Sequence, residues 1–238
     1  GGSYGLYKDS NTSSLMTVRN CTVTGSSTTG VYCYYGSALD MKNCIVAADG
    51  SGDHAVYIAS SSASMVSNNN CLLARNGANI GYYSSASRAT LSAWQTVTGK
   101  DAQSISVEPS FVDENGTDNL ANNGDDDLHL TSASPCLNVG DNSAVGVGTL
   151  DMDGQARILL TTVDIGADEY VDAPEIVVEL VTGTQLLDGS STAAYGFAGI
   201  GVAPYPAKTF TIRNTGIIDL TGLAISMDGA HAAEFSPG

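Results

Sequence analysis

Two acidic stretches contain the residues of this chain that are best suited to binding a metal ion. The first stretch holds Asp113 and Asp118, and the second holds Asp125, Asp126 and Asp127. Both also contain glycine and asparagine, which favour tight turns, and Ca²⁺ takes about six to eight oxygen ligands of the kind that acidic turns supply. The spacing is not that of an EF-hand, so solvated loops are the alternative. We expect no required cofactor, with Ca²⁺ as the ion that these residues would bind.

Two basic and two aromatic residues are the candidates for contact with a carbohydrate. Arg19 and Lys42 each directly precede an asparagine of a repeated motif, which would place both charges on one outer face. Tyr57 and Tyr82 lie in alternating segments, and tyrosine offers an apolar ring together with a polar hydroxyl group. Inward packing of the tyrosines is the alternative. These four residues predict a polysaccharide or a cell-surface glycan as the partner.

Motifs of familiar catalytic sites are missing from the sequence. It contains no Gly-x-Ser-x-Gly, no His-Glu-x-x-His and no phosphate-binding loop, and its three histidines are scattered. We therefore predict no catalytic residue. A polysaccharide lyase would need a basic side chain on an outer face, so Arg19 and Lys42 keep that alternative open.

Composition excludes two classes of partner. The chain carries 25 acidic and 9 basic residues, a net charge of −16, and such a surface repels the phosphates of nucleic acids. No apolar run reaches the roughly 18 residues that a membrane-spanning helix needs. We expect no nucleic acid and no membrane span.

A repeated Asn-Cys pair indicates how the first part of the chain folds. The pairs stand at Asn20-Cys21, Asn43-Cys44 and Asn70-Cys71, 23 and 27 residues apart, and each precedes a short apolar strand. Repeats of 20–30 residues with short alternating strands are typical of a β-solenoid. We expect an all-β, right-handed parallel β-helix in which two structural ladders form by stacking: Asn20, Asn43 and Asn70, and Cys21, Cys44 and Cys71. With five cysteines, a disulfide between some pair stays open.

A change of pattern over residues 88–100 predicts a short helix that caps the solenoid. Ala89, Leu91, Trp94 and Val97 have helical spacing, and a helix over the last coil would cover unpaired strand edges. Trp94 is expected to anchor this helix in the core. A sugar-stacking role for Trp94 is the alternative.

Six short motifs follow one another in a fixed order over residues from about 90 to 170. They are Gly-Lys-Asp-Ala-Gln-Ser-Ile (99–105), Pro-Ser-Phe (109–111), Leu-His-Leu (128–130), Ser-Pro-Cys-Leu-Asn-Val-Gly (134–140), Asp-Met-Asp-Gly-Gln-Ala-Arg (151–157) and Asp-Ile-Gly-Ala-Asp-Glu (164–169). This series resembles the closing segment of secreted bacterial right-handed parallel β-helix proteins, a region called choice-of-anchor Q. The resemblance implies a β-helix and export, and it leaves the activity open, because such proteins range from lyase-like enzymes to adhesins.

A second resemblance covers the end of the chain. The series Phe-Thr-Ile-Arg-Asn-Thr-Gly (210–216), Leu-Thr-Gly-Leu (220–223) and Asp-Gly-Ala-His-Ala-Ala-Glu-Phe (228–235) is similar to choice-of-anchor D repeats, Ig-like modules of the ASPM–SPD-2–Hydin group. A complete sandwich of this type needs about 100 residues, so we expect a truncated one. The predicted domains are residues 1–172, the β-helix with its closing segment, and residues 173–238, the partial sandwich.

These features predict a non-catalytic fragment of a secreted or cell-surface bacterial β-helix protein, acting as a stalk, an adhesin or a glycan-binding scaffold. The chain begins at Gly1 without a methionine, so we expect further domains of the same parent chain. The alternative is a polysaccharide lyase or glycoside hydrolase whose active cleft lies mostly upstream of this fragment.

Overall fold

The computed structural model describes residues 3–9, 14–35, 37–60, 64–121, 123–159, 161–171, 176–181, 184–186, 210–214 and 221–223. Contacts divide the chain into two compact units, Gly1–Tyr170 and Val171–Gly238, and each is described by itself. The predicted boundary between residues 172 and 173 lies outside the described residues, as does the motif at residues 228–235.

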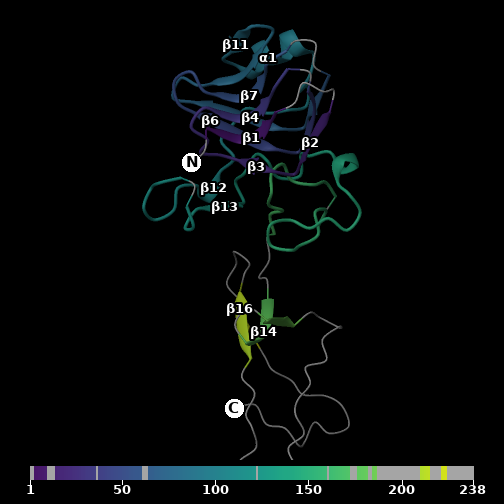
Figure 1. The fold of residues 1–238 in the computed structure, drawn as a ribbon. Coiled ribbons are helices and arrows are strands. Elements are labelled where there is room, and N and C mark those ends of the chain that lie inside the picture. The colour runs from purple at the N-terminus through teal and green to yellow at the C-terminus, as the bar shows by residue number, and fades with distance from the viewer. Residues whose placement is uncertain are drawn as a thin grey trace, which may run out of the picture. The chain divides into compact units, whose positions relative to one another are not determined.

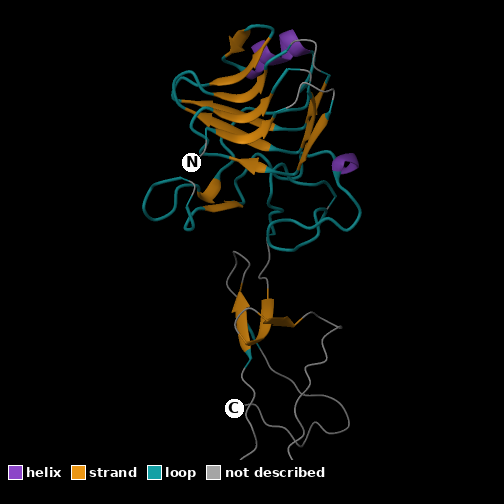
Figure 2. Cartoon of the chain, viewed as in Figure 1, coloured by secondary structure: helices purple, strands orange, loops and turns teal. Residues whose placement is uncertain are grey.

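Eleven short strands form the coils of the first unit: β1 (Tyr4–Lys8), β2 (Leu15–Arg19), β3 (Thr22–Val23), β4 (Thr29–Cys33), β5 (Ala38–Lys42), β6 (Ile45–Asp49), β7 (His54–Ile58), β8 (Met65–Asn68), β9 (Cys71–Arg75), β10 (Asn79–Tyr83) and β11 (Ala86–Arg88). They build three stacked sheets, ordered β1-β4-β7-β10-β11, β2-β5-β8 and β3-β6-β9 (Figure 1). All pairings are parallel except that of β10 with β11. From β1 to β10, each strand pairs with its counterpart in the neighbouring coil, so the predicted solenoid is confirmed, and Figure 2 shows its layers of parallel strands.

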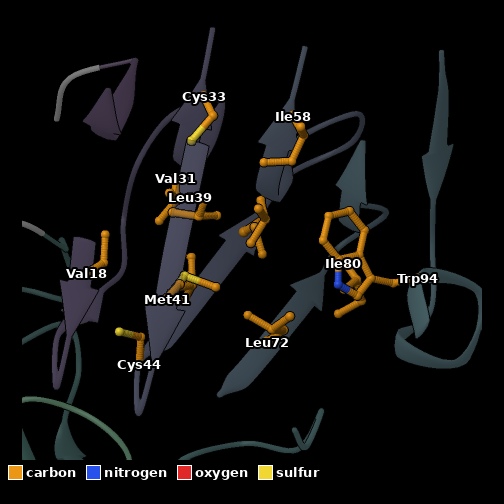
Figure 3. Close-up of a cluster of buried hydrophobic side chains, with 14 of the residues drawn as sticks. Val18, Val31, Cys33, Leu39, Met41, Cys44, Ile58, Leu72, Ile80 and Trp94 are labelled. Atoms are coloured by element: carbon orange, nitrogen blue, oxygen red, sulfur yellow. The ribbon is translucent and has the colours of Figure 1, made fainter. Parts of the chain in front are cut away.

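The interior of the solenoid is a column of apolar side chains. Val31 pairs in register with Val56, and both are fully buried. Met41 and Leu72 reach the same interior from the other two sheets, as Figure 3 shows. Burying one such side chain contributes about 1.5–3 kcal/mol. A single coil would leave these side chains exposed, so this stabilisation arises only when successive coils stack and cover one another.

Asparagine forms the sharp turn between the second and third sheets in two successive coils, as predicted. Asn20 and Asn43 have positive φ angles of 48° and 56°, a left-handed conformation that asparagine tolerates better than most residues. The side-chain amide nitrogen of Asn43 donates a hydrogen bond to the Asn20 Oδ1 at 3.0 Å. Cys21 and Cys44 follow these turns at equivalent positions, because Thr22 pairs with Ile45.

The predicted third member of each ladder is wrong by one residue. Lys42 pairs with Asn68 and Ile45 pairs with Cys71, so Asn69 takes the place expected for Asn70. Asn69 has the positive φ angle of the turn, 53°. The sequence holds three consecutive asparagines here, and the strand register selects the middle one.

This shift of one residue changes the surroundings of Asn70 and Cys71, because side chains alternate between the two faces of a strand. Asn70 occupies the place equivalent to Cys44 and is buried, with its Oδ1 accepting from the Cys44 N–H at 3.0 Å. Cys71 leaves the interior and packs on the outer side of its sheet, beside Cys136. All five cysteines are free thiols.

The predicted capping helix is confirmed as α1 (Leu91–Thr98). Thr90 caps its N-terminus, with the hydroxyl oxygen accepting from the Ala93 N–H at 3.2 Å, and Gly99 ends it with a φ of 66°. Trp94 is fully buried in the solenoid core (Figure 3), which confirms its role as the anchor. The helix therefore closes one end of the apolar column.

After α1, the closing segment (residues 101–170) covers the outer face of the β3-β6-β9 sheet. It contains β12 (Phe111–Asp113), β13 (Asp127–Leu130) and the short 3-10 helix η1 (Asn142–Ala144). Leu130, Cys136 and Ile165 pack there in a second core. The Gly166 N–H donates to the Asn43 carbonyl at 3.0 Å. This outer layer is what places the closing motifs next to the coils.

The second unit contains one described sheet. Strands β14 (Ile176–Val181), β15 (Thr184–Leu186) and β16 (Thr211–Asn214) pair antiparallel in the order β15-β14-β16. The Arg213 guanidinium binds the buried Glu179 carboxylate at 2.8 Å across β14 and β16. The Ig-like sandwich stays a prediction, because most of this unit lies outside the described residues.

Candidate functional site

Four tyrosines stack in register along the outer face of the first sheet. Tyr7 pairs with Tyr32, Tyr32 with Tyr57, and Tyr57 with Tyr82, one from each of β1, β4, β7 and β10. We call these four residues the tyrosine ladder. The preceding residues Val31 and Val56 are buried in the core, so alternation turns the tyrosines outward. The ladder is thus a direct product of the coil register.

Ring geometry decides what the tyrosine ladder presents to a ligand. Successive ring centroids lie 5.1, 4.9 and 4.2 Å apart, and the rings of Tyr57 and Tyr82 are parallel. Because each ring face lies against its neighbour, the ladder exposes ring edges and a row of hydroxyl groups rather than ring faces. Burial and the hydrogen bond with the Tyr82 hydroxyl raise the pKa of Tyr57 to about 12, so Tyr57 is neutral and donates at physiological pH.

A shallow, open depression borders the tyrosine ladder. It is lined by Tyr32 and Tyr57, by the small polar residues Thr28, Thr29 and Ser51, and by Asp53 and His54. The His54 ring meets Tyr57 and Tyr82 edge-on, at centroid distances of 5.4 and 5.7 Å. Burial lowers the pKa of His54 and so favours its neutral form, although the nearby Asp53 carboxylate opposes this. The depression combines aromatic edges with several small polar groups.

The two predicted basic contacts lie on a different sheet from the tyrosines. Arg19 pairs in register with Lys42 across β2 and β5, so the predicted neighbouring pair exists. Both charges are engaged: Arg19 binds the Asp40 carboxylate, and the Lys42 ammonium binds Asp141 at 2.8 Å. The bond with Lys42 lowers the pKa of Asp141 to about 2. The structure thus brings Tyr57 and Tyr82 together but separates them from Arg19 and Lys42.

The predicted calcium ligands lie in the closing segment, between the end of β12 and the start of β13, and four of them accept local hydrogen bonds. Asp125 accepts from the Thr117 N–H and hydroxyl group, at 2.9 and 2.8 Å. Three more accept from backbone N–H groups nearby: Asp118 from Leu120, Asp126 from Asn123, and Asp127 from His129. Asp113, the fifth predicted ligand, is an exposed residue of β12. A calcium site at these residues stays a prediction.

A different group of ligands converges nearby, which sequence analysis did not predict. Nitrogen of His129 and carboxylate oxygens of Asp153 and Asp168 all lie within 4.8 Å of one another. The His129 Nε2 is 2.9 Å from the Asp153 Oδ2, and its Nδ1 is 2.5 Å from the Asp127 Oδ1. Burial opposes protonation of His129, but the hydrogen bonds with Asp127 and Asp153 outweigh it and raise the pKa to about 9.

The only sequence signal for this group is that all three residues belong to motifs of the closing segment: Leu-His-Leu, Asp-Met-Asp-Gly and Asp-Ile-Gly-Ala-Asp-Glu. Because the three residues lie far apart along the chain, the sequence does not indicate that they are in contact. The contact forms because two loops fold back onto β13.

Arg157 holds the last of these loops in place from a buried position. Its guanidinium donates to the carbonyls of Asp164, Gly166 and Ala167, at 3.2, 2.9 and 2.8 Å. The Glu169 carboxyl group lies 3.8 Å away. Burial and the neighbouring Asp164 carboxyl raise the pKa of Glu169 to about 8, because Arg157 offsets only part of the cost of burying this charge.

Glu169 is therefore expected to make stability fall as pH rises. The group has a pKa near 4.3 in an unfolded chain and about 8 when folded, so between these values the unfolded state loses a proton that the folded state keeps. Its contribution is fully present below about pH 4 and is lost as pH rises through 8. Urea unfolding from pH 5 to 8 should show a shallower decline for Glu169→Gln than for the wild type. Equal slopes would contradict this assignment.

Comparison with known proteins agrees with this architecture. A family model described as a right-handed beta helix region matches residues 4–147, more than half of the chain. No curated protein and no solved structure matches the chain. In the described part of the chain, no helix has the length and apolar character that crossing a membrane requires. From the stacked parallel coils and the family match together, we conclude that the chain belongs to the right-handed β-helix family.

Proposed function

We propose that this chain is a non-catalytic, glycan-binding part of a secreted or cell-surface bacterial β-helix protein. The tyrosine ladder is the observation that carries the proposal. Four phenol groups repeat along the solenoid axis with the spacing of adjacent strands, about 4.8 Å. A linear polysaccharide lying along this axis would meet a phenol group on every coil, so a repeating ligand would match a repeating row of contacts.

Hydroxyl groups, rather than ring faces, would make most of the sugar contacts. Ring faces in the interior of the ladder are covered by the neighbouring rings, at centroid distances of 4.2–5.1 Å. The phenol edges remain accessible, since Tyr7 is 47% exposed and Tyr57 and Tyr82 are half-buried. Thr28, Ser51 and Asp53 in the adjoining depression supply further donors and acceptors.

Charge favours a neutral polysaccharide. The net charge of −16 repels uronate polymers, and the Asp53 carboxylate lines the depression itself. A neutral glycan avoids this repulsion while offering hydroxyl groups to the ladder. The choice-of-anchor modules resembled by the closing segment and the second unit support a location outside the cell, where the chain would present its ladder as a stalk or adhesin.

A lyase or glycoside hydrolase of the β-helix type is the less supported alternative. Arg19 and Lys42, the two bases considered for it, are both bound to carboxylates, and a catalytic base must be free to take a proton. Incubation with pectate, alginate or chondroitin, followed by the absorbance of unsaturated products, tests this alternative. Turnover that is lost in Arg19→Ala or Lys42→Ala would favour it over the binding proposal.

The tyrosine ladder makes the binding proposal testable by substitution. We expect wild-type protein to be retarded in native gels containing a neutral polysaccharide such as xylan, β-glucan or cellulose derivatives. The double variant Tyr57→Phe/Tyr82→Phe keeps both rings and removes both hydroxyl groups. Since each hydrogen bond contributes about 0.5–1.5 kcal/mol, the loss of two should make this variant bind roughly 5- to 150-fold more weakly.

Tyr170→Phe is the control, because Tyr170 lies in the closing segment and packs against the second core, on a different sheet from the ladder. It should bind as the wild type does. Migration of the wild type that no neutral polysaccharide changes, or equal retardation of the ladder variant, would refute the proposal.

A further inference from the structure

We propose that His129, Asp153 and Asp168 form a binding site for a divalent transition-metal ion, with Zn²⁺ as the probe. The three residues come from β13, from the loop after residue 150 and from the end of the closing segment. A nitrogen of His129 and one oxygen from each carboxylate lie within 4.8 Å of one another. An ion here would join three separate parts of the closing segment.

The donor set matches the known preferences of Zn²⁺. Imidazole suits zinc and its first-row neighbours, whereas Ca²⁺ takes oxygen ligands alone. Ligand distances of about 2.0–2.2 Å in a tetrahedral site would place donor atoms roughly 3.4 Å apart. The His129 Nε2 and the Asp153 Oδ2 are already 2.9 Å apart, so small side-chain rotations suffice.

Asp127 provides an independent feature of metal sites, a carboxylate that contacts the ring nitrogen of the histidine on the side away from the ion. A histidine that binds a metal almost always gives its other ring N–H to a carboxylate or carbonyl. Here the His129 Nδ1 contacts the Asp127 Oδ1 at 2.5 Å, which leaves the Nε2 facing the other two carboxylates. The ring is therefore held in the orientation that coordination through Nε2 needs.

The two carboxylates differ in a way that suits a site with access from solvent. Asp168 is only 4% exposed and is fixed by the Leu130 N–H, which donates to its Oδ2 at 2.7 Å. Asp153 is exposed, so an ion can enter from its side. Burial of a carboxylate is costly unless a positive charge faces it. An ion bound here would provide such a charge beside Asp168.

Calorimetric titration with ZnCl₂ tests the site on the full chain. We expect one ion per chain at this site, and an affinity at least about 10-fold lower for Asp153→Asn and His129→Gln. Asp127→Ala should weaken binding by about 10- to 100-fold, the usual effect of losing an outer carboxylate. Asp153 is exposed, so Asp153→Asn should fold normally, which circular dichroism will verify. Co²⁺ provides a second readout, because its visible absorption on binding should be lost in the same variants.

Two matched controls separate this site from others. His54→Gln removes a half-buried histidine of the coils, and Asp125→Asn removes a carboxylate of the predicted calcium loop; both should bind Zn²⁺ like the wild type. The proposal is overturned if the wild type binds no Zn²⁺, if Asp153→Asn and His129→Gln bind as tightly as the wild type, or if Asp125→Asn abolishes binding. None of these outcomes depends on whether the tyrosine ladder binds a glycan.

Discussion

Replacing Trp94 with alanine is expected to lower the free energy of unfolding of the β-helix by about 3–5 kcal/mol, the usual cost of deleting a buried aromatic side chain. Trp94 is fully buried and is the only tryptophan in the chain. It closes the apolar column at the α1 end, where it lies beside Ile80 of the last parallel strand, β10 (Figure 3). Urea unfolding followed by circular dichroism at the β-sheet band measures the loss.

Trp94→Phe separates packing from hydrogen bonding at the same position. The indole Nε1 donates to the Asp101 Oδ2 at 2.8 Å, and Asp101 is 1% exposed. Phenylalanine keeps most of the apolar volume but leaves this oxygen without its donor, which costs about 1–3 kcal/mol. Thr96→Ala, on the same helix but outside the core, is the control and should change stability little. A loss below about 1 kcal/mol in Trp94→Ala would show that the helix does not close the core.

Replacing Arg157 with methionine is expected to have the second large effect, a loss of about 3–5 kcal/mol. Arg157 is 2% exposed and donates to three carbonyls of the closing segment. Methionine fills similar space but leaves the acceptors without donors, and each unsatisfied buried group costs about 1–3 kcal/mol. Hydrogen exchange should rise most at Ile165 and Gly166, whose N–H groups bind the carbonyls of Cys136 and Asn43.

Arg157→Lys tests why this position requires arginine. Lysine keeps the positive charge but has no planar fork to reach several carbonyls at once, so it should rescue only part of the loss. Arg75→Met removes an arginine from two partly buried ion pairs, with Glu108 and Glu114. It is expected to cost less, because Arg75 is 20% exposed and water can reach the carboxylates that it leaves. Faster exchange throughout the coils, rather than at residues 161–170, would contradict a local role for Arg157.

Short-range patterns in the sequence predicted the solenoid and its cap. The Asn-Cys repeats place the turns at Asn20 and Asn43, and helical spacing around Trp94 predicts α1. These predictions succeed because turns, alternation and helix periodicity depend on residues within one coil. The buried position of Trp94 follows from the same local pattern.

Register between coils could not be predicted in the same way. The sequence offers Asn68, Asn69 and Asn70 as equivalent candidates for the third turn, and the pairing of β8 and β9 with the preceding coil selects Asn69. The choice moves Cys71 from the inner to the outer core. A one-residue register shift reverses every side chain of a strand, and only contacts between neighbouring coils decide it.

By itself, the sequence determined the coil repeat, the all-β class and the capping helix, since these arise from interactions within about 25 residues. Only the tertiary structure decided that Tyr7 joins Tyr32, Tyr57 and Tyr82 in one ladder, because β1 precedes the first Asn-Cys motif and no earlier repeat indicates its register. It likewise decided that His129 meets Asp153 and Asp168, which are 24 and 39 residues further along the chain. Such long-range contacts depend on how loops pack against the finished coils, and no local pattern in the sequence records that packing.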